Sequence, residues 1–188
     1  VCIGLDISTQ KRYLLDVSNR AGMKPDELRQ LIKDWTDKYG VHEWRIEKNA
    51  FQTMLTQDRE VREYLALRGS QLKEHHTGQN KWDEDFGVAS LATLFDGYED
   101  EKNLIEFPSS HASEGIKALI EQLVTWYPGA PKGQKKDCVM AFWFTELGCR
   151  DRLVTSSIYS RSHQTYSMFH TRYDKSQQIV INANDYIS

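Results

Sequence analysis

The sequence predicts an α/β protein in which a mixed or parallel sheet is flanked by helices. Two observations lead to this fold class. Short runs of β-favouring residues alternate with longer segments whose apolar residues recur at helical spacing, in the order strand, helix, strand, helix, strand. In addition, the chain has 188 residues, of which 39% are hydrophobic, so it can bury a core, and this length favours one domain.

The individual elements are predicted from local patterns. Residues 1–5 and 11–17 are β-favouring runs joined by a short polar segment, which is typical of a hairpin. The next helix begins at Pro25, because proline and acids suit a first helical turn, and it ends at Gly40. The remaining elements are predicted as strand 42–47, helix 51–67, strand 70–77, helix 82–95, strand 103–107, helix 116–126 and a helix from Asp137.

Residues 153–188 are predicted to be a tail outside the domain formed by residues 1–152. From Val154 onward the chain is rich in Ser, Thr, Gln, Tyr and His, and its apolar residues follow no sustained period. Such a composition is typical of an extended appendage or of a partly disordered segment.

The composition limits the possible partners and compartments. The net charge is -3, so a polyanion would have to bind a local cationic face. The three cysteines, Cys2, Cys138 and Cys149, lack the spacing of a metal site and are interpreted as buried thiols in a reducing compartment. Neither a signal peptide nor a membrane-spanning run is visible, so a cytosolic location is expected. The sequence has no GxxxxGK[ST] loop and therefore does not encode a complete ATPase.

Two carboxylates are the candidate catalytic residues. Glu47 closes a short apolar strand, and Asp137 opens an apolar helix far downstream. A carboxylate at the end of a strand is held rigidly at the edge of the sheet, where open α/β folds place their chemistry. If the fold brings the two acids together, they can hold the divalent cations of a phosphodiesterase. Taken singly, each acid is better explained as an exposed strand end or a first-turn helix acid.

Cationic residues in the flanking loops support the nuclease interpretation. Lysines in such loops suit contact with a phosphate backbone. The candidate DNA-binding residues are Lys48, Lys81, Lys132, Lys135 and Lys136.

Other polar and aromatic residues are weaker candidates. Asp6 competes for a third metal-ligand position, although a polar turn residue of the hairpin is the favoured interpretation. His75 and His76 cannot jointly chelate a metal, because neighbouring strand residues point to opposite faces. The tryptophans Trp82, Trp126 and Trp143 are interpreted as packing anchors and not as surfaces for base stacking.

Four segments resemble the C-terminal nuclease domain of the large terminase subunits of tailed bacteriophages. They are KRYLLDV at 11–17, WRIEKNAFQ at 44–52, the loop 77–83 continuing into FGVAS at 86–90, and KDCVMAFWF at 136–144. The match is in order and spacing, and it covers most of the chain up to about Arg152. These domains cut concatemeric DNA and have an RNase H-like fold, in which three carboxylates bind two Mg²⁺ or Mn²⁺ ions.

The resemblance implies roles for the two acids and a missing third. Glu47 is similar to the family's second acid and Asp137 to its third. The first acid, together with the central strand that carries it, would lie upstream of Val1, and Asp6 is the alternative as a shifted first ligand. Where many members carry two neighbouring acids, this chain has Lys136 and Asp137. A fragment that lacks one of three carboxylates is expected to be nearly inactive, because uncompensated charge between close cations is costly.

The resemblance also implies partners and a location. They are double-stranded DNA, an ATPase domain in the full protein, a small terminase subunit and the capsid portal, in the cytoplasm of the infected bacterial host. Two alternatives stay open. One is a non-catalytic RNase H-like module that docks on DNA or on the portal. The other is a different RNase H-like nuclease, such as a junction resolvase, which would require a branched substrate.

Overall fold

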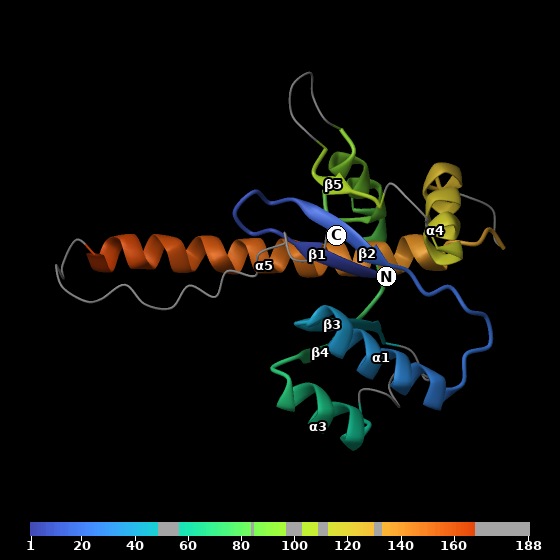
Figure 1. The fold of residues 1–188 in the computed structure, drawn as a ribbon. Coiled ribbons are helices and arrows are strands. Elements are labelled where there is room, and N and C mark those ends of the chain that lie inside the picture. The colour runs from blue at the N-terminus through green and yellow to red at the C-terminus, as the bar shows by residue number, and fades with distance from the viewer. Residues whose placement is uncertain (49–56, 84, 97–102, 109–112, 130–132, 168–188) are drawn as a thin grey trace. The chain divides into compact units, whose positions relative to one another are not determined.

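The computed structural model describes residues 1–48, 57–83, 85–96, 103–108, 113–129 and 133–167 (Figure 1). Its strands and helices confirm an α/β fold. In chain order they are β1 Cys2–Leu5, β2 Arg12–Asp16, α1 Pro25–Tyr39, β3 Glu43–Glu47, α3 Arg59–Leu67, β4 Gln71–His75, the 3₁₀ helices η1 Gln79–Trp82 and η2 Val88–Leu94, β5 Ile105–Glu106, α4 Glu114–Thr125 and α5 Asp137–Ser167. The chain divides into two compact units, Val1–Leu153 and Val154–Ser188.

The strands form two sheets, whereas the sequence predicted one. In the first sheet β2 lies between β1, which is antiparallel to it, and β5, which is parallel. The second sheet is the parallel pair of β3 and β4. The predicted hairpin and the parallel pairing are thus confirmed. Within the described residues no strand pairs with both β1 and β3, so a single RNase H-like sheet stays a prediction.

The core of the first sheet is closed by α5. Leu14 of β2 packs in one buried cluster with Val139 and Phe142 of α5, and residues of α4 and η2 complete this cluster. A buried ion pair joins the same two elements. The guanidinium of Arg12 donates from Nε and Nη2 to the two carboxylate oxygens of Glu146, at 3.0 and 2.7 Å. Both side chains are almost fully buried, at 5% and 1% exposure.

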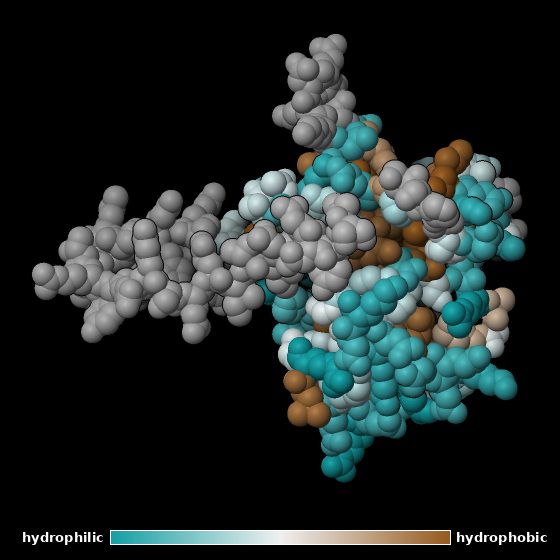
Figure 2. All heavy atoms as spheres, in the orientation of Figure 1, coloured by the Kyte–Doolittle hydropathy of each residue, from teal (hydrophilic) through white to brown (hydrophobic). Residues whose placement is uncertain are grey.

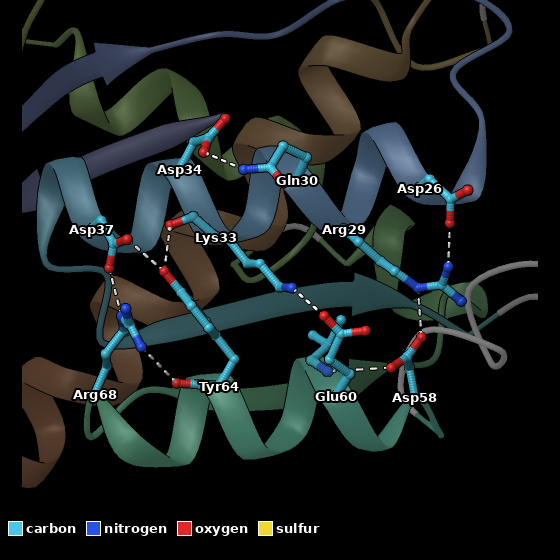
Figure 3. Close-up of polar contacts among 11 residues, drawn as sticks. Asp26, Arg29, Gln30, Lys33, Asp34, Asp37, Asp58, Glu60, Tyr64 and Arg68 are labelled. Atoms are coloured by element: carbon cyan, nitrogen blue, oxygen red, sulfur yellow. Dashed lines mark hydrogen bonds and ion pairs between the residues drawn. The ribbon is translucent and has the colours of Figure 1, made fainter.

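A second, smaller core lies between the helices α1 and α3 and the sheet of β3 and β4. Ile32, Val61 and Leu65 are buried there, and Trp44 and Leu72 pack against them from the strands. The outer sides of the two helices are polar, and Figure 2 shows a mainly hydrophilic surface over them. Acidic and basic side chains of α1 and of the α3 region point toward one another in Figure 3, with ion pairs of Arg29 with Asp58, Lys33 with Glu60, and Arg68 with Asp37.

The ends of α1 lie where the sequence predicts them. The helix begins at Pro25, and the carboxylate of Glu27 accepts a hydrogen bond from the backbone N–H of Lys24 at 2.7 Å. It ends at Gly40, whose φ of 60° is left-handed and favours glycine. Among the described helices, none has both the length and the apolar composition needed to cross a membrane.

The predicted helix 82–95 is wrong. The structure has the two short 3₁₀ helices η1 and η2 in this region, separated by a turn. The Asp83 carboxylate oxygen Oδ1 accepts hydrogen bonds from the backbone N–H groups of Asp85 and Phe86 at 2.9 and 2.8 Å, which favours a turn over a continuous helix. Trp82 is 52% exposed, so its interpretation as a packing anchor is also wrong, whereas Trp143 is buried as expected.

Helix α5 extends further than the sequence predicts. It continues through Ser167, into the segment interpreted as an extended or partly disordered tail. Adding residues to an existing helix avoids the cost of nucleation, so a weakly helical sequence can follow a strongly helical one. The predicted helix 51–67 is confirmed over α3, and residues 51–56 lie outside the described part of the chain.

All three cysteines are free and buried, as the sequence predicts. Burial raises the pKa of Cys149 to about 12, with a further contribution from the nearby carboxylate of Glu146, and raises that of Cys2 to about 11. Burial also raises the pKa of Cys138. We therefore expect almost no reaction of the folded chain with Ellman's reagent at pH 8 and release of all three thiols in denaturant. Rapid labelling without denaturant would contradict the burial of the cysteines.

Candidate functional site

The sheet of β3 and β4 has two chemically different faces. In the parallel pair, Glu43 lies opposite Gln71 and Glu47 opposite His75, so each paired residue points to the same face as its partner. Trp44 and Leu72 point into the core against α1 and α3. Because side chains alternate along a strand, Glu47 and His75 point to the opposite face.

Helix α5 lies against this second face and runs antiparallel to the two strands. Near the amino end of β3, Arg45 forms an ion pair with Asp151, and a Cβ atom at Gly148 would lie 3.4 Å from both the Arg45 Nε and a Glu43 oxygen. At the carboxyl end of β4, the His75 ring lies 5.3 Å from the nearest ring centroid of Trp143. Moving along the strands toward their carboxyl ends therefore means moving toward the N-terminus of α5.

Glu47 and Asp137 consequently lie at the same end of this arrangement. Glu47 is half-buried at the end of β3, on the side that faces α5. Asp137 is the exposed first residue of α5. Asp137 precedes Phe144 by about two helical turns, so these two residues lie on one side of the helix, roughly 10 Å apart along its axis. Phe144 contacts His75, with 5.0 Å between the ring centroids.

The structure does not gather a complete set of metal ligands. Among the described residues, no group of three His, Cys, Asp or Glu side chains is arranged to hold an ion. Glu47 and Asp137 could supply two of the ligands of a site between the end of β3 and the start of α5. The carboxylate of a third acid is not contributed by the described residues.

Asp6 occupies the hairpin turn between β1 and β2. Its Oδ1 atom accepts hydrogen bonds from the backbone N–H and the hydroxyl of Ser8, at 2.8 and 2.7 Å, and from the N–H of Thr9 at 3.3 Å. The hydrogen bonds from Ser8 and, to a lesser extent, from Thr9 lower the pKa of Asp6 to about 2. The geometry is that of a polar turn residue, the favoured sequence interpretation.

The four described candidate lysines lie at the same end as the two acids. Lys48 directly follows Glu47 and is exposed, with its Nζ atom 3.5 Å from a carboxylate oxygen of Glu74. The exposed Lys135 and Lys136 immediately precede α5. Lys132 lies outside the described residues.

Lys81 belongs to the segment that follows β4. Its Nζ atom lies 5.2 Å from the centroid of the Trp82 ring. This segment is fastened to α5, because the Trp143 side chain donates a hydrogen bond from Nε1 to the carbonyl of Phe86 at 2.8 Å. The candidate lysines therefore come from three separate parts of the sequence, which follow β3, follow β4 and precede α5.

His75 is a residue of this region that the sequence interpretation set aside. Its Nε2 atom is buried, and none of the described residues forms a hydrogen bond with it. Burial, and next the charge of Arg45, lower the pKa of His75, which favours the neutral imidazole. His75 and His76 are still not expected to chelate one metal ion together, but the register of the two strands places His75 beside Glu47. Strand register is not encoded in the local pattern that was available from the sequence.

Comparison with known proteins identifies no relative. No protein-family model matches the chain, and no curated protein or solved structure matches it. The function is therefore inferred from the arrangement around Glu47 and from the resemblance of the four sequence segments.

Proposed function

We propose that the chain is the metal-dependent endonuclease domain of a phage DNA-packaging terminase, and that it cuts concatemeric duplex DNA by hydrolysis of a phosphodiester bond. The observation that carries the proposal is that Glu47 and Asp137, ninety positions apart in the sequence, lie at the same end of the α5-facing side of the second sheet. Exposed lysines at that end suit contact with the phosphates of DNA.

The residues at this end fit a hard divalent cation. Glu47 and Asp137 carry carboxylate oxygens, the ligands that Mg²⁺ and Mn²⁺ prefer. When bound, two such ions would activate the attacking water and stabilise the developing charge on the phosphate. Glu47 and Asp137 would hold the cations, and the lysines would hold the DNA backbone in register.

An RNase H-like sheet would require a strand between the two observed sheets. Two features support this finer proposal. Within the described residues, β1 and β3 are both edge strands, which leaves backbone groups on each for pairing with a further strand. Helix α5 packs on the first sheet through Phe142 and contacts the second sheet through Trp143. It would therefore cover one face of a single sheet that contains the strands of both. A central strand ending in Asp would then supply the first acid.

The proposal is tested by nicking of supercoiled plasmid in the presence of Mn²⁺. Residues 1–188 alone are compared with a version extended upstream through a strand that ends in Asp. We expect the extended protein to cut DNA and residues 1–188 to cut at least about 100-fold more slowly. Loss of a residue that only hydrogen-bonds to a metal ligand already lowers activity 10- to about 100-fold, and loss of a ligand should lower it more. A chelator should abolish cleavage by the extended protein.

The other outcomes of this assay are equally informative. Equal rates for the two proteins would mean that residues 1–188 contain the first ligand, with Asp6 as the candidate. Binding of DNA without cutting by either protein would overturn the nuclease proposal in favour of a docking module. That second function is favoured by one observation, the lack of a three-ligand group among the described residues.

A further inference from the structure

His75 is the cross-strand neighbour of Glu47, a position that the sequence interpretation did not assign to it. The two residues are directly paired across β3 and β4, and both point to the α5-facing side. Parallel strands are about 4.8 Å apart, so the two side chains leave their backbones at about this separation. A carboxylate and an imidazole at this distance can share one small ion.

The surroundings fix the ring of His75 without completing its hydrogen bonds. Trp143 contacts the ring edge-on, at an interplanar angle of 90°, and Phe144 packs against it with 5.0 Å between centroids. These aromatic rings restrict the imidazole, but Phe144 has no polar side-chain atom and the indole N–H of Trp143 already donates to the carbonyl of Phe86. A buried ring nitrogen without a partner is costly, so this atom suits a hydrogen bond to water or coordination of an ion.

The nearby guanidinium of Arg45 is already bound to other carboxylates and does not serve as the partner of His75. Arg45 lies on the same face, two residues before Glu47, but its guanidinium donates to Glu43 at 2.5 Å and also forms an ion pair with Asp151. Lys73 likewise pairs with Glu43 at 2.6 Å. The basic residues of this face are thus neutralised toward the amino end of the strands, and Glu47 and His75 remain together at the carboxyl end.

We infer that His75 supplies an imidazole nitrogen ligand to the divalent cation held by Glu47, so that this position selects Mn²⁺ over Mg²⁺. Mg²⁺ strongly prefers oxygen ligands, whereas Mn²⁺ also accepts imidazole. The inference rests on the proposed function for the role of Glu47 as a metal ligand, and it adds a ligand and a metal preference to that site.

The test is the binding of Mn²⁺, measured without DNA by electron paramagnetic resonance on residues 1–188 and on the upstream-extended protein. Bound Mn²⁺ should show electron spin echo modulation from a directly coordinated ¹⁴N nucleus. His75→Ala is expected to remove this modulation and to weaken Mn²⁺ binding on the order of 10-fold. Competition by Mg²⁺ should then become more effective relative to the unmodified protein.

Two matched variants make the result specific to His75. His76→Ala removes the neighbouring imidazole, which follows the end of β4 and is not paired with Glu47, and should keep both the nitrogen modulation and the affinity. His75→Gln keeps a polar side chain of similar size and should also lose the modulation, which covers the case that His75→Ala does not fold. Circular dichroism confirms that each variant is folded.

The inference is overturned if bound Mn²⁺ shows no nitrogen modulation, if the modulation persists in folded His75→Gln, or if neither protein binds Mn²⁺. These outcomes are separate from the fate of the nuclease proposal. A nitrogen-coordinated Mn²⁺ in a protein that never cuts DNA would retain the His75 ligand and refute the nuclease. Cleavage of DNA with an ion that is coordinated only by oxygen would retain the nuclease and refute the His75 ligand.

Discussion

Glu146→Ala is expected to lower the free energy of unfolding by about 3–5 kcal/mol, because it leaves the guanidinium of Arg12 buried without its acceptor. Both side chains lie between β2 and α5, at 5% and 1% exposure, and are joined by two hydrogen bonds. Arg150 also donates to Glu146 at 3.0 Å, so the loss affects two cations. Urea unfolding followed by circular dichroism measures the effect.

A double variant and an exposed pair serve as controls. Arg12→Met combined with Glu146→Leu removes both almost fully buried charges and should cost less than Glu146→Ala, because only the more exposed Arg150 then loses its carboxylate partner. Glu63→Ala removes the partner of Arg59 in an exposed pair on α3 and should change stability by about 0.5 kcal/mol or less. If Glu146→Ala costs no more than Glu63→Ala, the buried ion pair does not fasten α5 to the first sheet.

The parts of the fold that local chemistry encodes were predicted from the sequence. Helix α1 begins and ends as predicted, because Pro25 and Gly40 set its limits through their own backbone preferences. The hairpin of β1 and β2 was likewise predicted, since its turn contains a short polar side chain at Asp6 that bonds to the next backbone groups. In such cases a few adjacent residues determine the structure.

The parts that depend on distant residues were predicted poorly. The exposure of Trp82 accompanies the turn at Asp83 and the hydrogen bond from Trp143 of α5 to the carbonyl of Phe86, and neither is visible in an apolar pattern. The division into two sheets depends on which strands pair. The position of His75 beside Glu47 depends on strand register as well. For this reason the sequence suggested the acids of the candidate site but not the imidazole beside Glu47.

Glu47→Gln and Asp137→Asn should each reduce DNA cleavage by the upstream-extended protein at least about 100-fold, since even the neighbours of metal ligands contribute 10- to about 100-fold. Both changes keep the size of the side chain and remove its charge. Glu47 is half-buried and Asp137 exposed, so the fold should tolerate either change. Asp137 lies in the first turn of α5, where an acid contributes about 1 kcal/mol at most, so unfolding should change little.

Two acids that resemble the candidates locally provide matched controls for these variants. Glu74 lies at the same end of the second sheet but is paired with Ile46 and points to the other face, so Glu74→Gln should keep cleavage within about threefold. Glu114 is the first residue of α4, as Asp137 is of α5, so the Glu114→Gln protein should also keep its rate of DNA cleavage. If Glu114→Gln and Asp137→Asn were equally active, the Asp137 carboxylate would only stabilise a helix terminus. Full activity of Glu47→Gln would remove the acid on which the proposed chemistry depends, because Glu47 alone connects the strand end, His75 and the α5-facing side.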